Sequence, residues 1–169
     1  MKTYLKSVFA LTMICAVIGV ALAYTNMLTS PVIEKNDQKA VEQSLKFVMP
    51  DGKDFSLVAL ENLELPETVS EIYKSSDGGY VVKLETSGYA PGMVIMCGVD
   101  KDGVVAGATC ISCGETLGHE ETYGEKLLDK TLENIESVDT VASATKTTSA
   151  YKNAVKDALL VAQILKGGE

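Results

Sequence analysis

The chain has 169 residues, of which 46% are hydrophobic. It contains 23 acidic residues and 15 basic residues, all of them lysine, which gives a net charge of −8. This balance argues against nucleic acid as a partner, because phosphates demand a basic face, and without arginine no bidentate guanidinium clamp for a phosphate or carboxylate exists. The chain has a single histidine, His119, which excludes a multi-histidine metal centre. A Ser-His-Asp hydrolase could use only His119 as its catalytic histidine.

An uncharged apolar run over residues 8–24 predicts a membrane-spanning helix. Lys2 and Lys6 precede the run, and Tyr4 and Tyr24 bracket it as interfacial aromatic residues do. At about 1.5 Å per residue the run lies near the short end of a bilayer-spanning helix, and the next few apolar residues lengthen it. We therefore expect residues 1–28 to be a transmembrane anchor.

The lysines before the span indicate its orientation. Positively charged flanks stay in the cytoplasm. The N-terminus is therefore expected on the cytoplasmic side of the cell membrane, and everything after Thr25 on the outer side. The alternative is a cleaved signal peptide, because Ala21-Leu-Ala23 resembles a cleavage site.

A helix is expected to continue from the membrane over residues 26–50, with residues 29–50 as its membrane-proximal part. Pro31 fits a first-turn position after Ser30, and apolar residues then recur at helical spacing. Pro50-Asp-Gly52 predicts its end, and residues 57–65 have no clear assignment.

The remaining residues, 51–169, predict one extracytoplasmic domain. Alternating or β-rich runs predict strands at 79–86, 93–99 and 104–111. Asp100-Lys-Asp-Gly103 predicts a hairpin between the last two strands. Apolar spacing predicts a short helix at 125–135 and a longer one at 149–165. The expected fold class is α+β: an N-terminal anchor helix, an antiparallel sheet and flanking helices.

The segment 139–149, just before the last predicted helix, is small and rich in hydroxyl groups. A helix start with small side chains is a ready anion site, because unpaired N–H groups and the helix dipole point at the ligand, and Lys146 adds charge. On physical grounds alone a simpler interpretation stays open: Thr148 or Ser149 is an N-cap and the other hydroxyls face water.

Cys110-Ile-Ser-Cys113 is a C-x-x-C pair. A closed zinc or iron–sulfur site needs four ligands, and the hairpin register places Cys97 near Ala106 or Ala108 instead of opposite Cys110. A disulfide, or two unrelated thiols, is therefore favoured over a metal centre outside the cell. A redox-active pair beside a cofactor remains an alternative.

Asp139, Ala142-Ser-Ala-Thr145 and Thr147 are similar to the flavinylation motif of FMN-binding-domain proteins, Asp-x-x-(Ser/Thr)-Gly-Ala-Thr-x-(Thr/Ser). Other motifs occur in the expected order: LTSPVIEKN (28–36), GYVVKLETSGY (79–89), GMVIMCGVDKDG (92–103) and GETLG (114–118). Together they resemble the G subunits of Rnf electron-transport complexes and, more remotely, the C subunit of the sodium-pumping NADH:quinone oxidoreductase.

The resemblance implies that a flavin transferase joins the phosphate of FMN to Thr145, with Thr147 as the less favoured acceptor. It also assigns Asp139, Ser143, Ala144 and Lys146 of the motif to cofactor binding, and Glu115, Thr116 and Gly118 to the lining of the flavin site. For the last three residues a polar surface loop after an edge strand stays open as the alternative. Two departures are evident. Ala142-Ser143 replaces the usual Ser/Thr-Gly pair, which puts a β-carbon where the family has none, and the family's ETPGLG is altered around His119. His119 itself is interpreted as a solvated loop residue instead of a metal ligand or proton relay.

The function implied is that of an electron-carrier subunit with covalent FMN in a membrane redox complex that moves electrons between ferredoxin and NAD, coupled to ion transport. The flavin supplies the redox chemistry and the protein supplies position and electrostatics, so the chain alone is not a complete enzyme. The expected partners are other membrane subunits of an Rnf-type translocase. Two alternatives stay open: a stand-alone flavinylated carrier for another extracytoplasmic reductase, and a non-redox anchored binding module.

Overall fold

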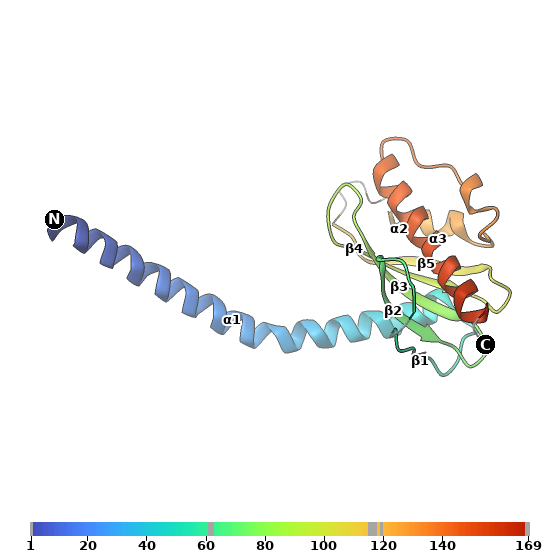
Figure 1. The fold of residues 1–169 in the computed structure, drawn as a ribbon, viewed down its shortest axis with the longest axis horizontal. Coiled ribbons are helices and arrows are strands. Elements are labelled where there is room, and N and C mark those ends of the chain that lie inside the picture. The colour runs from blue at the N-terminus through green and yellow to red at the C-terminus, as the bar shows by residue number, and fades with distance from the viewer. Residues whose placement is uncertain (1, 61–62, 115–117, 119, 168–169) are drawn as a thin grey trace. The chain divides into compact units, whose positions relative to one another are not determined.

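The computed structural model describes residues 2–60, 63–114, 118 and 120–167 (Figure 1). The chain divides into two compact units, residues 1–40 and 41–169. Its elements in chain order are α1 (Lys2–Val48), β1 (Ser56–Leu57), β2 (Val69–Lys74), β3 (Tyr80–Thr86), β4 (Met93–Val99), β5 (Val105–Ser112), α2 (Glu120–Tyr123), the 3₁₀ turns η1 (Gly124–Leu127) and η2 (Ile135–Ser137), and α3 (Thr145–Gly167). The predicted α+β class is confirmed.

The helix α1 runs without a break through residues 2–48 of the two predicted N-terminal segments. Among the described residues it is the one helix long and apolar enough to cross a membrane. The first-turn position predicted for Pro31 is wrong, because Pro31 lies in the interior of α1. Proline removes the backbone donor to the carbonyl of Met27, and in the turn before it the hydroxyls of Thr29 and Ser30 bond to the carbonyls of Thr25 (3.0 Å) and Asn26 (2.8 Å).

The sheet is an antiparallel meander in the order β1-β2-β3-β4-β5. The three predicted strands are confirmed, 93–99 to the residue and the other two within one residue at each end. The predicted hairpin is confirmed as well: the Asp100 carboxylate accepts the amides of Asp102 (2.8 Å) and Val104 (2.9 Å), and Gly103 adopts a φ of 82°. β1 and β2 were not predicted, since β2 mixes polar and apolar residues and is interrupted by a bulge between Val69 and Glu71.

The helix α3 packs on one face of the sheet and closes the main core (Figure 1). Its buried stripe is Tyr151, Ala154, Val155, Ala158, Leu159, Val161 and Ala162. The ammonium group of Lys166, in its last turn, donates to the carbonyl of Asp100 (3.4 Å) in the β4–β5 turn. Because α3 therefore ends at that turn, it begins at the opposite end of the sheet, where β4 starts and β5 stops.

The other face of the sheet receives the last turn of α1. A β-carbon on Gly98 would lie 2.4 Å from the carbonyl oxygen of Val48, and one on Gly107 would lie 2.6 Å from the same atom. Gly98 and Gly107 are paired across β4 and β5, so two missing side chains let the helix backbone touch the sheet. Leu45, Val48 and Met49 are buried there.

The helix predicted at 125–135 is wrong. That stretch holds η1, a reversal at Asp129 with φ of 60°, and the start of η2. Its leucines have helical spacing, but the backbone bonds to the edge of β5: Val105 donates to Lys130 (2.9 Å) and Asp129 donates to Val105 (3.0 Å). Pairing with a sheet edge overrides the local pattern.

Candidate functional site

The loop 138–144 leads into α3, which begins at Thr145 and not at the predicted Ser149. Thr148 and Ser149 are therefore inside the helix, and the N-cap interpretation of these two residues is wrong. The Thr148 hydroxyl donates to the Ala144 carbonyl (2.9 Å) one turn back and accepts from the Val141 amide (3.2 Å).

Exposure separates the threonines at this helix start. Thr145 is exposed, whereas Thr147 keeps 4% of its surface and Thr148 none. The Thr145 hydroxyl lies 3.5 Å from the carbonyl of Val141, at the outer limit of a hydrogen bond. Thr145 is thus the one of the three that a bulky group can reach without disturbing the core.

The donors around Thr145 fit a phosphate. Amides in the first turn of a helix cannot bond to carbonyls of that helix, and the dipole makes this end positive. Lys146 is exposed beside them, and the preceding Ala142 and Ser143 are small and exposed. This set of backbone N–H groups, a hydroxyl and a lysine suits the phosphate of FMN without an arginine clamp.

Ser143 has a φ of 74°, in the left-handed region. Ser143 occupies the position at which the motif has glycine, the residue that adopts this conformation at no steric cost. The structure thus gives a physical reason for the motif's glycine, and it shows that the loop keeps the turn even with a β-carbon present.

Two further side chains hold the start of the loop, and neither was predicted. The Tyr123 hydroxyl donates to the carbonyl of Asp139 (3.3 Å), and the Lys152 ammonium donates to the carbonyl of Val138 (3.3 Å). Tyr123 is buried and its ring packs edge-on against Tyr151, with centroids 5.8 Å apart. Burial, together with the charge of Asp139, raises the pKa of Tyr123 and keeps it a donor. No sequence signal marked either residue, because both contacts link segments far apart in the chain.

The end of β5 lies at the same end of the sheet as Thr145. Cys110 and Cys113 form a disulfide there, and Cys97 pairs with Ala108, as the hairpin register predicted. Of the residues predicted along the flavin, Gly118 is exposed with a φ of 64°. Glu115 and Thr116 lie outside the described residues, as does His119. Within the described part of the chain no group of three or more potential ligands gathers for a metal.

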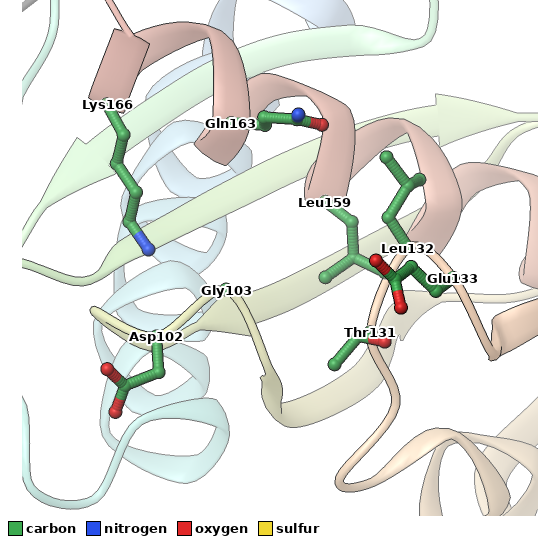
Figure 2. A pocket seen from close by; sticks show the side chains of 8 residues that line it. All are labelled: Asp102, Gly103, Thr131, Leu132, Glu133, Leu159, Gln163 and Lys166. Carbon is green, nitrogen blue, oxygen red and sulfur yellow. The ribbon is translucent and has the colours of Figure 1, made fainter.

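Two cavities lie at the opposite end of the sheet. One of about 430 Å³ opens between the β4–β5 turn and the last turns of α3, and Figure 2 shows Lys166, Gln163 and Glu133 around it. A second of about 530 Å³ lies beside residues 49–52 and the same turn. Neither of these two cavities is lined by a predicted site residue.

Residues 88–160 match the family model of the FMN-binding domain. These residues belong to the FMN-binding-domain family. The domain runs from the β3–β4 loop to Leu160 in α3, and it contains the disulfide, the loop 138–144 and Thr145. The family resemblance of the sequence is thereby confirmed.

Two curated relatives carry related names. The chain is 34% identical over 131 residues to the G subunit of the Na(+)-translocating ferredoxin:NAD(+) oxidoreductase complex of Acetobacterium woodii, a match that covers 69% of this chain and 63% of that protein. It is 23% identical, over an alignment of 186 positions, to the G subunit of the proton-translocating ferredoxin:NAD(+) oxidoreductase complex of Clostridium ljungdahlii. This match covers 97% of this chain and 96% of that protein. The matched part of the chain thus spans under two thirds of the length of the first relative.

Proposed function

We propose that this chain is the electron-carrier subunit of an Rnf-type membrane complex, with FMN attached through a phosphoester to Thr145. The FMN-binding domain supports the cofactor, and the names of both relatives support membership of a ferredoxin:NAD(+) oxidoreductase complex. When bound, FMN supplies the electron-transfer chemistry, and the chain holds it in place. A covalent bond suits a carrier that faces outward, where a free cofactor would be lost by diffusion.

The observation that carries this proposal is the exposed hydroxyl of Thr145 at the positive end of α3. A phosphate on its oxygen lies where first-turn amides can donate to it, and Lys146 contributes charge. Thr147 is the weaker candidate, because its side chain is 4% exposed and an ester there would have to displace core packing.

Intact mass spectrometry of chain produced together with a flavin transferase tests the attachment. We expect one added FMN mass on the native chain, its loss in Thr145→Ala, and its retention in Thr147→Ala. Loss in Thr147→Ala with retention in Thr145→Ala would show that the acceptor is the other threonine. A native chain that never acquires FMN would contradict the proposed function itself.

We further propose that residues 1–28 of α1 anchor the chain in the cell membrane, that residues 29–50 continue as a membrane-proximal helix, and that residues 51–169 lie outside. The length and apolar composition of α1 support a span, and the position of Lys2 and Lys6 supports its direction. Protease added to right-side-out vesicles should digest the domain, and inverted vesicles should protect it. The reverse pattern would overturn the orientation.

Other membrane subunits of the complex are the proposed partners. Their co-purification with the chain in mild detergent distinguishes a component of the complex from a stand-alone flavinylated carrier. A chain that purifies alone, yellow and flavinylated, would favour the stand-alone carrier.

A further inference from the structure

The Thr148 side chain joins the two ends of the turn that precedes Thr145. It is fully buried, and its oxygen accepts from the Val141 amide at 3.2 Å while its hydroxyl proton is directed at the Ala144 carbonyl at 2.9 Å. Within the turn, the Ala144 amide also donates to the Val141 carbonyl (3.0 Å). One hydroxyl group thus fixes both Val141, where the turn begins, and Ala144, which immediately precedes the acceptor.

This turn needs an external restraint because it contains Ser143 in the left-handed region, a conformation that costs a non-glycine residue conformational energy. The tethers from Tyr123 and Lys152 reach only Asp139 and Val138, at the start of the loop. The two bonds of the Thr148 side chain instead reach Val141 and Ala144, the two ends of the turn 141–144, from the buried face of α3.

We propose that Thr148 is a positioning residue for the attachment of FMN to Thr145. The inference rests on the proposed function, since it concerns how the acceptor is presented. Thr148 touches neither phosphate nor flavin: it is buried, three residues along the helix from the acceptor. Its hydroxyl holds the 141–144 turn in the single conformation that directs Thr145 outward with the first-turn amides beside it. A flavin transferase then meets a preformed acceptor and does not have to order the turn itself.

Thr148→Val tests this inference, because valine has nearly the same shape but can neither donate nor accept. We expect covalent FMN to be incorporated about ten- to a hundredfold more slowly into Thr148→Val, the scale of loss that misplacement of a reacting group by about 1 Å causes. Thr148→Ser keeps the hydroxyl and should restore most of the rate. The measurement is the fraction of full-length chain carrying FMN against time, by intact mass, with the fold of each variant checked by circular dichroism.

Thr68→Val is the matched control. Its hydroxyl also bonds to α3, at Asp157 (2.7 Å), but nine residues farther along the helix, so the variant should lose a comparable threonine bond and keep the native rate. If Thr68→Val slows incorporation as much as Thr148→Val does, general loss of stability is responsible and the positioning role is wrong.

The outcomes separate the two proposals. A native chain without FMN would refute the proposed function, whereas normal FMN on the native chain and an unchanged rate in Thr148→Val would refute only the inference. If Thr148→Val does not fold, Thr148→Cys replaces it, because sulfur is a weak donor and acceptor. Hydrogen exchange on the native chain adds a check without a variant: the Val141 amide should be protected although it lies in a loop, and rapid exchange would overturn the proposed contact.

Discussion

Replacement of Ser143 by glycine should stabilise the domain. At φ of 74° the β-carbon of a non-glycine residue costs about 1–2 kcal/mol. Glycine offsets part of this gain, because it adds about 0.4–1 kcal/mol of conformational freedom to the unfolded chain. The Ser143 side chain is exposed, so little packing is lost. The net effect should be about 0.5–1 kcal/mol in favour of glycine, or roughly 2–4 °C in melting temperature for a domain of this size.

Ala142→Gly is the control for this prediction. Ala142 is the exposed neighbour of Ser143 and does not have a positive φ, so glycine there should only add freedom to the unfolded state and destabilise by about 0.5–1 kcal/mol. Thermal unfolding of the two variants and the native chain, in the same detergent, gives the comparison. If Ser143→Gly lowers the melting temperature as Ala142→Gly does, Ser143 is not in the left-handed region and the structural reason for the motif's glycine is wrong.

Two predictions concern the cysteines. The double variant Cys110→Ser/Cys113→Ser should keep its FMN and still cycle between oxidised and reduced flavin when titrated with dithionite. The native chain should contain no stoichiometric iron or zinc. Metal that disappears in the double variant would show a metal site completed by Cys97 or by a partner. Burial raises the pKa of the Cys97 thiol to about 12, so at pH 8 only about 10⁻⁴ of it is the reactive thiolate. Iodoacetamide should leave Cys97 unmodified in the folded chain and alkylate it in denaturant, and equal rates in both would show that the thiol is accessible.

The sequence by itself predicted those elements whose cause is local. A charge-free run predicted the N-terminal part of α1, and alternating or β-rich runs of side chains predicted β3, β4 and β5. The Asp100–Gly103 hairpin followed from turn residues that bond to their own backbone. The family motif was recognisable for a similar reason, because its small and hydroxylated residues are consecutive in the chain.

Only the tertiary structure decided which of the adjacent threonines is exposed. Thr145, Thr147 and Thr148 have the same side chain, and their burial depends on where α3 begins and on the sheet beneath it. Sequence spacing placed that start four residues too late, because the bonds of Thr148 to the turn before it are visible only once the turn is formed.

The same reason explains the other differences. The stretch 125–135 has helical spacing but bonds to the edge of β5, and Tyr123 reaches Asp139 across 16 residues of chain. Local patterns fix the conformations that a segment favours, whereas contacts between distant segments supply the hydrogen bonds and burial that select one of them. In this protein the resemblance to the flavinylation motif was evident in the sequence, but the exposure of Thr145 was decided by the packing of α3 on the sheet.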